Sequence, residues 1–511
     1  MRRLATLLFL ALLYLPALGA SESGTHPDES YYLAISAEMD RDGAWLTPTM
    51  DGIPFWYKPP LLYWAERAAY STFGRDFFAA RLPAALCAIA LALLTGALAR
   101  RMYGERAGLL ATLLTAGTFG FLRFGRMAMM DAPMALALTL AAYGAWRAAE
   151  EERPLLLLLC GVGAAMATML KGPVGAVLVL LIAGGWLALR KPRLLASRHT
   201  LLAFAVGAAL ALPWYALSLS RHGRRFWQFF VVEQNVDRFR HPWTLHGEAT
   251  LLVGFLVFLL PWTFLFLGSL PALRRLREPG VLLPAVWIAA VLLLFTVPSL
   301  KWPHYGLACS PAAVLLACRA PPPRWARIAT ALVLTLAAAV IALAPRFPMP
   351  AAGKVGFLLA SALLLSAAIA TWAGRLAGAA ALGGLGLAAL VAVALPTVNP
   401  PALPAGARDA LDGREVWFYG PPPPGVFTLA LGRPVHKAWG AGAAAAVLRA
   451  GGAVIVAQPN LAEIPVPQGQ LRELLRWNHL PGNLPPAAVA KAWRAGDPSP
   501  LFEPMLAVSL R

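Results

Sequence analysis

Charged residues are scarce in this chain, and acidic residues are the scarcest. Only 14% of the 511 residues are charged, with 25 Asp and Glu against 44 Lys and Arg, whereas 59% are hydrophobic. Soluble globular domains carry roughly 25% charged and roughly 45–50% apolar residues. One core could not bury this much apolar surface, so the composition excludes a soluble enzyme and a disordered protein. It indicates a polytopic membrane protein.

Cysteine is also rare, and its placement excludes a disulfide scaffold. The four cysteines are Cys87, Cys160, Cys309 and Cys318, and each lies inside an apolar run. They show no CxxC spacing, so we interpret them as small hydrophobic side chains within helices.

Long apolar runs recur along the chain. A spanning helix needs about 20 apolar residues, and continuous Ala and Leu without alternation indicate helices rather than strands. We predict about thirteen helices, of which the third, fourth and tenth are short: 4–20, 82–99, 107–122, 132–146, 154–170, 172–189, 200–219, 250–268, 281–298, 304–318, 325–343, 355–372 and 376–395. The first run also fits a cleaved signal peptide, with Arg2-Arg3 before it and Leu18-Gly19-Ala20 at its end, but we favour a retained helix.

The net charge of +19 divides between the two sides of the membrane. Nucleic acid is the usual partner of so basic a soluble protein, but in an apolar chain we expect anionic lipid instead and no nucleic acid. With a cytoplasmic N-terminus, every inner loop is basic, as the positive-inside rule requires. The outer segments then include a long first loop over 21–81, the turn at Lys171, and the tail. Several of them carry Lys or Arg against that rule, which favours anion binding there.

The tail from 396 to 511 differs in character from the rest. Pro-rich stretches precede three runs that we predict to be strands, 415–419, 453–457 and 505–509, and two that we predict to be helices, 461–477 and 486–495. We therefore expect two domains: a transmembrane domain over 1–395 and a small periplasmic α/β domain over 396–511.

The first outer loop holds two adjacent carboxylates, Asp28 and Glu29, just beyond the first span. A carboxylate at the membrane interface can act as a general base or bind a metal ion. The alternative is a structural role, with Asp28 capping an amphipathic helix on the membrane surface. From the residues alone, both readings stay open.

Several ordered motifs resemble those of one enzyme family. They are Asp28-Glu29-x-x-Tyr32, Gly43-x-Trp45-x-x-Pro48, Lys58-Pro59-Pro60-Leu61, Arg81-Leu82-Pro83, Arg126 with Asp131-Ala132-Pro133, Lys171-Gly172, the stretch from Phe229 to Phe239, Leu260-Pro261-Trp262 and Ser299-x-Lys301-x-x-x-Tyr305. Together they resemble the bacterial glycosyltransferases related to the aminoarabinose transferase of lipid A, with protein O-mannosyltransferases as more distant relatives. The resemblance covers about the first 320 residues, and most of the motifs fall on the predicted outer face.

The resemblance implies an integral-membrane enzyme of the GT-C fold that uses a polyprenyl-phosphate-linked sugar. It places the catalytic carboxylate on Asp28, with Glu29 beside it, and the donor-phosphate lysine on Lys58. Two positions depart from the aminoarabinose branch: Tyr31 stands where that branch has an arginine, and Tyr57 where it has an acidic residue. These departures put the same sugar, and a metal at that position, in doubt.

Other side chains at outer ends of the spans could join such a site. A phosphate leaving group develops negative charge, which preorganised cations stabilise. The donor-phosphate candidates are Lys58, Arg126, Lys171, Arg238, Lys301 and Tyr305, with Asp131 and His304 as further candidates. Three of these residues have an alternative interpretation that places them outside a phosphate site. Lys171 could snorkel to the interface, Asp131 could form a structural ion pair with Arg126 or Arg123, and Arg238 could bind lipid headgroups.

We therefore predict an all-α polytopic GT-C glycosyltransferase of a bacterial inner membrane, monomeric, with its active site in the periplasm. The donor is a polyprenyl-phosphate sugar, and the acceptor is lipid A, another glycolipid or a protein. A polyprenyl-lipid transporter is the alternative of a different class, but no internal repeat supports it. No cofactor is certain; a divalent metal stays open, because the histidines match no known ligand spacing.

Overall fold

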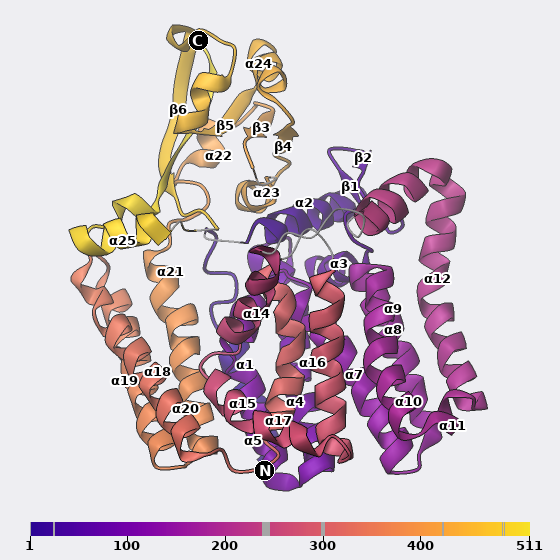
Figure 1. Cartoon of the computed structure of the whole chain (residues 1–511). Coiled ribbons are helices and arrows are strands. Elements are labelled where there is room, and N and C mark those ends of the chain that lie inside the picture. Colours follow the sequence, from indigo (N-terminus) through magenta and orange to yellow (C-terminus); the bar gives the residue numbers. More distant parts are fainter. Residues whose placement is uncertain are drawn as a thin grey trace.

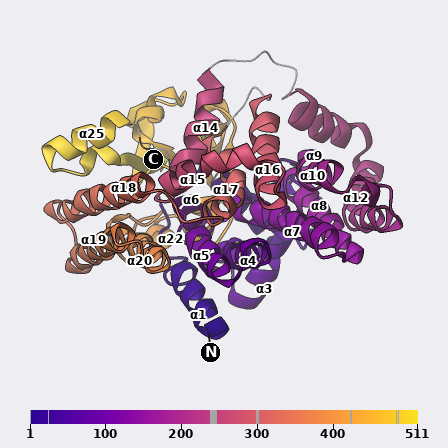
Figure 2. The same cartoon turned by 60° about the horizontal axis from the view of Figure 1, so that its bottom comes forward.

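The computed structural model describes residues 2–23, 26–237, 246–297, 302–421, 424–482, 484 and 486–511. Helices form a bundle, and a small sheet domain stands on one end of it (Figure 1). The N-terminus lies at the opposite end of the bundle from the C-terminus. Figure 2 shows the bundle from that N-terminal end, with α18, α19 and α20 grouped along one side.

All thirteen predicted runs are helical over most of their described length. The bundle consists of α1 (Arg2–Tyr14), α4 (Phe77–Tyr103), α5 (Glu105–Ala116), α6 (Phe119–Phe124), α7 (Asp131–Glu150), α8 (Leu158–Lys171), α9 (Pro173–Val179), α10 (Gly185–Arg190), α11 (Pro192–Leu195), α12 (Arg198–Phe226), α14 (His246–Phe258), α15 (Thr263–Ser269), α16 (Pro279–Thr296), α17 (Ser310–Ala317), α18 (Arg324–Ala342), α19 (Ala351–Trp372), α20 (Leu376–Ala389) and α21 (Leu395–Val398). Among the described residues, eight helices are long and apolar enough to cross a membrane. The helices over 250–258 and 263–275 meet at a bend of 108°, and they give a ninth spanning segment if the pair is one broken span.

The remaining predicted spans are shorter or broken for local reasons. The third run divides into α5 and α6 at Gly117, and the amide of Phe119 turns away to donate to the carbonyl of Leu260 at 2.8 Å. The tenth begins as a 3₁₀ helix over Pro303–Cys309 before α17. The length and composition of the longer helices make the chain a multi-pass membrane protein.

Helix α1 is built into the bundle. The guanidinium of Arg126 donates to the carbonyl oxygens of Leu13, Tyr14 and Pro16 at 3.2, 2.7 and 2.6 Å. These are carbonyls at the end of a helix, which have no partner within the helix itself. The Tyr14 hydroxyl in turn donates to the carbonyl of Ala116 at 3.0 Å. These contacts make α1 part of the helical bundle.

The segment over 21–81, predicted to be the first outer loop, folds into two helices with a hairpin between them. Helix α2 (Pro27–Arg41) leads into the short strands β1 (Thr49–Met50) and β2 (Ile53–Pro54), and α3 (Leu61–Phe73) follows. Glu29 on α2 is fully buried and pairs with Arg81 of α4, with Oε1 2.8 Å from Nε. The same oxygen accepts the backbone amide of Ala128 at 2.8 Å. This buried pair fixes α2 against the end of the bundle.

The tail forms a five-stranded sheet with the order β4-β3-β5-β7-β6. Its strands are β3 (Val416–Tyr419), β4 (His436–Ala438), β5 (Ala453–Ala457), β6 (Leu471–His479) and β7 (Glu503–Leu510), and its helices are α22 (Ala407–Ala410), α23 (Gly425–Leu431), α24 (Ala441–Arg449) and α25 (Pro486–Ala495). Strand β3 runs parallel to β4 and β5, while β7 is antiparallel to β5 and β6. The fully buried β5 lies at the centre of the sheet.

The three predicted strands of the tail and the helix over 486–495 are confirmed. The predicted helix over 461–477 is wrong, because this segment ends a 3₁₀ helix and then forms β6. Pro465 and Pro467 lie inside the predicted helix, and proline interrupts the hydrogen bonds of a helix interior. Beyond the prolines, the segment pairs with β7 instead.

The sheet domain rests directly on α2. The first residue of α23, Gly425, lies so close that a Cβ there would be 2.1 Å from the Ser30 carbonyl oxygen and 2.6 Å from the Ala34 amide nitrogen. Both are backbone atoms, which cannot rotate away. Only glycine therefore permits this contact between the two parts of the chain.

We predict that Gly425→Ala separates the sheet domain from α2. The added methyl must displace backbone, a kind of overpacking that typically costs about 1–3 kcal/mol. The expected result is a lower midpoint of thermal unfolding for the purified protein and faster proteolysis of the tail. Gly442→Ala is the matched control, since nothing lies within 4 Å of a Cβ at that position. Equal behaviour of the two variants would contradict the close contact.

We also predict that Arg81→Met is strongly destabilising, because it leaves the Glu29 carboxylate buried without its cation. Breaking a buried ion pair in this way costs about 3–5 kcal/mol. The double variant Glu29→Gln/Arg81→Met removes both charges and should recover part of the loss. Thermal unfolding of the three proteins in the same detergent measures the difference. A double variant less stable than Arg81→Met alone would count against the pair as described.

Candidate active site

One cavity at the end of the bundle below the sheet domain gathers most of the predicted site residues. Six of them line it: Asp28, Lys58, Asp131, Lys171, His304 and Tyr305. They come from α2, from the segment between β2 and α3, from α7 and α8, and from the 3₁₀ helix before α17. Segments far apart in the sequence thus meet at a single place.

Asp28 lies in the first turn of α2 and is only 8% exposed. The hydroxyl of Tyr57 donates to its Oδ1 at 3.3 Å. His26 precedes the helix, and its Nδ1 accepts the backbone amide of Asp28 at 3.2 Å. Burial lowers the pKa of His26, which favours the neutral imidazole that this hydrogen bond requires. His26 is therefore the capping residue, and the Asp28 carboxylate faces the cavity.

Lys58 reaches the same cavity from the opposite wall. Its Nζ lies 4.2 Å from the centre of the Tyr57 ring. Pro59 and Pro60 follow immediately and fix the backbone before α3 begins at Leu61. Tyr57 thus contacts both the carboxylate and the cation of the site.

Lys171 and Asp131 form an ion pair in the cavity wall, with Nζ 3.2 Å from Oδ1. The Lys171 ammonium also lies 4.9 Å from the centre of the Tyr305 ring. Gly172 ends α8 with a φ of +80°, a conformation that favours glycine, and the chain turns directly into α9. The Lys171 side chain is only 12% exposed, so it enters the cavity rather than snorkelling to the membrane surface. Asp131 is paired as one reading expected, but with Lys171 instead of an arginine.

Two predicted site residues have other roles. Glu29 is turned away from the cavity and buried against Arg81, because its helix places it on the face that packs on α4. Arg126 holds the carbonyls at the end of α1 and does not line the cavity. The predictions of a catalytic Glu29 and a phosphate-binding Arg126 thus lack a place in this site. Arg238 and Lys301 lie outside the described residues.

The cavity also contains residues that the sequence analysis does not predict as site residues. Tyr57, Tyr32, Phe230, Gln234 and Asn235 line it. The last three belong to a π-helical stretch over Trp227–Val236, in which Asn235 donates to the carbonyl of Phe230 at 2.6 Å. The sequence does contain a signal for Phe230, Gln234 and Asn235, because they lie in the motif from Phe229 to Phe239 that carries the family resemblance. Tyr57 was noticed only as a departure from one branch.

A metal centre is not evident in the part of the chain that the structure describes. No three His, Cys, Asp or Glu side chains come together there as a metal site requires. His26 and His304 lie near each other, with ring centroids 5.0 Å apart, but edge against face.

An apolar groove lies beside the cavity, on the flank of the bundle formed by α3, α4, α7, α8 and α12. Its lining includes Leu61, Trp64, Met166, Leu170 and Leu210. Leu61 follows Lys58 by three residues, and Leu170 directly precedes Lys171. Residues of the groove thus lie close to both lysines along the chain.

Comparison with known proteins gives consistent matches. The family model of dolichyl-phosphate-mannose-protein mannosyltransferases matches residues 1–228. The undecaprenyl phosphate-alpha-4-amino-4-deoxy-L-arabinose arabinosyl transferase of Edwardsiella ictaluri is 30% identical over 313 residues, covering 57% of this chain and 54% of that protein. An uncharacterized protein of Aquifex aeolicus is 28% identical over 299 residues, covering 57% of this chain and 58% of that protein.

The chain spans little more than half the length of these curated relatives. The structural match is broader. The crystal structure of ArnT from Cupriavidus metallidurans bound to undecaprenyl phosphate superposes with a TM-score of 0.75 at 20% identity, covering 98% of this chain and 96% of that chain. This match establishes the fold and confirms the predicted architecture. The chain has the GT-C fold of that structure, and over residues 1–228 it is similar to the dolichyl-phosphate-mannose-protein mannosyltransferases.

Proposed function

We propose that this protein is a glycosyltransferase that moves a sugar from a polyprenyl phosphate to lipid A or a related envelope glycolipid. The observation that carries the proposal is the meeting of Asp28, Lys58 and Lys171 in one cavity, with an apolar groove on the flank of the same bundle. A carboxylate, two cations and an apolar channel are what a lipid-linked sugar phosphate and an attacking nucleophile need together. The names of the relatives point to the same donor class.

The lysines would hold the donor phosphate. A lysine ammonium has three N–H donors, and Lys171 uses one of them on Asp131, so the others can face a phosphate. Lys58 would approach the same phosphate from the segment before α3. The isoprenoid chain would lie in the groove that includes Leu61 and Leu170.

Asp28 would act on the acceptor. An acceptor oxygen attacks the anomeric carbon, the bond between that carbon and the phosphate oxygen breaks, and its electron pair leaves with the polyprenyl phosphate. If the acceptor is a hydroxyl group, Asp28 takes its proton; if it is a phosphate, Asp28 mainly orients it. Attack on the face opposite the phosphate inverts the anomeric centre. The lysines stabilise the charge that develops on the leaving group.

The site would face the periplasm of a bacterial inner membrane. Helix α11 and the junction of α4 with α5 lie at the end of the bundle away from the sheet domain (Figure 1), and both are flanked by arginines. Cytoplasmic loops carry the excess of Lys and Arg, which supports a cytoplasmic N-terminus and a periplasmic sheet domain. One chain contributes every side chain of the proposed chemistry, in agreement with a monomer.

We predict that Asp28→Asn lowers kcat for sugar transfer by about 100-fold or more, since general-base contributions are typically about 10²–10⁴-fold. The KM for the donor should change little, because Asp28 acts on the acceptor. Purified protein in lipid nanodiscs, supplied with a polyprenyl-phosphate sugar and lipid A, provides the measurement. Asp40→Asn is the matched control: Asp40 lies on the same helix but pairs with Arg75 outside the cavity. Wild-type turnover by Asp28→Asn would remove Asp28 from the mechanism.

Lys58→Ala should weaken donor binding and slow transfer together, because the phosphate loses a cation in both the ground and transition states. We expect a higher donor KM and a lower kcat, with partial recovery in Lys58→Arg. Lys354→Ala, an exposed lysine of α19, is the control for loss of one positive charge. If Lys58→Ala and Lys354→Ala gave the same kinetics, Lys58 would have no role at the phosphate.

A further inference from the structure

A second cavity lies between α2 and the sheet domain, separate from the one that holds Asp28. Its wall on the side of α2 is Tyr31, and the sheet domain supplies Tyr419, Lys437, Trp439, Asn460 and Glu463. The cavity measures about 480 Å³, within the range of small-molecule binding sites. Nothing in the chemistry proposed above uses it.

The lining combines aromatic faces with hydrogen-bonding groups. Trp439 is 61% exposed, so its indole ring is accessible in the wall of the cavity. Tyr419 donates its hydroxyl to the carboxylate of Glu463, and the amide of Asn460 lies in the same wall. An indole ring can pack against the C–H face of a sugar ring while carboxylate and amide groups bind its hydroxyls. A purely apolar ligand would offer no hydrogen bond to the Asn460 amide or to the Glu463 carboxylate.

Only a pair of stacked rings separates this cavity from Asp28. Tyr31 stacks on Tyr57 with ring centroids 5.0 Å apart and planes 19° from parallel. Tyr57 lines the other cavity and donates to Asp28. A molecule resting against Tyr31 is therefore separated from the Asp28 carboxylate by the rings of Tyr31 and Tyr57.

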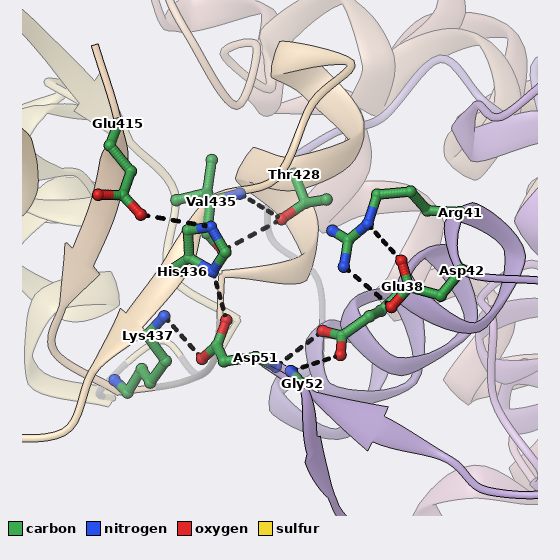
Figure 3. A network of polar contacts seen from close by, with 10 residues as sticks. All are labelled: Glu38, Arg41, Asp42, Asp51, Gly52, Glu415, Thr428, Val435, His436 and Lys437. Atoms are coloured by element: carbon green, nitrogen blue, oxygen red, sulfur yellow. Dashed lines mark hydrogen bonds and ion pairs between the residues drawn. The ribbon is translucent and has the colours of Figure 1, made fainter. Parts of the chain in front are cut away.

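The strand that carries Lys437 and leads to Trp439 is fixed relative to α2 by a polar bridge (Figure 3). Asp51, at the tip of the β1–β2 hairpin, accepts from His436 Nδ1 at 2.9 Å and from the amide of Lys437 at 3.0 Å. Glu38 of α2 accepts the amides of Asp51 and Gly52 at 2.7 and 2.8 Å. The two sides of the cavity are thus joined through one hairpin.

The side chain of Lys437 extends from this strand, and its ammonium donates to the carbonyl of Gly420. The ammonium also lies 5.9 Å from the centre of the Trp439 ring. Burial lowers the pKa of Lys437 to about 8, so the group is still mostly charged at neutral pH. Lys437 thus adds a positive charge to the lining of the cavity, where Glu463 is the other charged side chain.

We propose that this cavity is the acceptor subsite, and that it binds the saccharide headgroup of the acceptor glycolipid with a sugar ring against Trp439. The proposal rests on the proposed function, because it names where the second substrate of the same reaction binds. Tyr31 and Tyr57 form the border across which the reacting group of the acceptor reaches Asp28. The sheet domain is then part of substrate recognition.

The test compares Trp439→Ala, Trp439→Phe and Trp372→Ala in the full-length protein in nanodiscs. Trp372 on α19 is the matched control, since it is 62% exposed and lies outside both cavities. With a polyprenyl-phosphate sugar as donor and lipid A as acceptor, Trp439→Ala should raise the acceptor KM about tenfold, equivalent to about 1.4 kcal/mol. The donor KM should stay unchanged. Trp439→Phe should keep most of the affinity, and Trp372→Ala should match the wild type.

A binding measurement separates this inference from the proposed function. The probe is the water-soluble phosphorylated glucosamine disaccharide left after lipid A is fully deacylated, titrated by NMR without any donor. Saturable binding that is lost in Trp439→Ala supports the subsite, even if the wild type transfers no sugar and the proposed function falls. Transfer by the wild type with an unchanged acceptor KM in Trp439→Ala overturns the subsite and leaves the proposed function standing. Transfer to a peptide but not to lipid A also overturns it.

Discussion

The buried ion pair between Glu29 and Arg81 is the contact on which the site depends. It fixes α2 to α4, and the hydrogen bond from the Ala128 amide adds the segment that leads into α7. Two charges taken out of water are stabilised only when geometry and hydrogen bonding are good, and here both are. Asp28 is the neighbouring residue on α2, so the pair that holds Glu29 also sets the carboxylate of the cavity. Of these two adjacent carboxylates, Glu29 is buried in the ion pair and Asp28 lines the cavity.

The cavity keeps its charges paired before any substrate arrives. Lys171 pairs with Asp131, and Asp28 accepts from Tyr57. An isolated charge in such a place would be costly, because burial penalises ions without partners. Both groups can form further hydrogen bonds, because the Lys171 ammonium has more than one N–H donor and the Asp28 carboxylate has a second oxygen. The resting site can therefore be stable and still receive a phosphate and a nucleophile.

Much of this was predictable from the sequence, because apolar runs identify spans and the spans determine which loops share an end. Asp28, Lys58 and Lys171 meet as expected for that reason. Glu29 and Arg126 could not be assigned in the same way, since their partners are remote: Arg126 bonds to Leu13, 113 positions earlier. No local pattern in the sequence reveals a contact between residues so far apart in the chain. The prediction of a helix over 461–477 failed for a different reason: its apolar spacing indicates a helix, but Pro465 and Pro467 interrupt the hydrogen bonds of a helix interior.

Arg126 has a consequence for how the bundle is assembled. The terminal carbonyls of α1 accept from a side chain that leaves the ribosome only after α4, α5 and α6 have been made. Until then these carbonyls of α1 lack the donor that the folded bundle gives them. Helix α1 is thus completed later than helices that follow it in the chain, and its final position is set by a residue more than a hundred positions downstream.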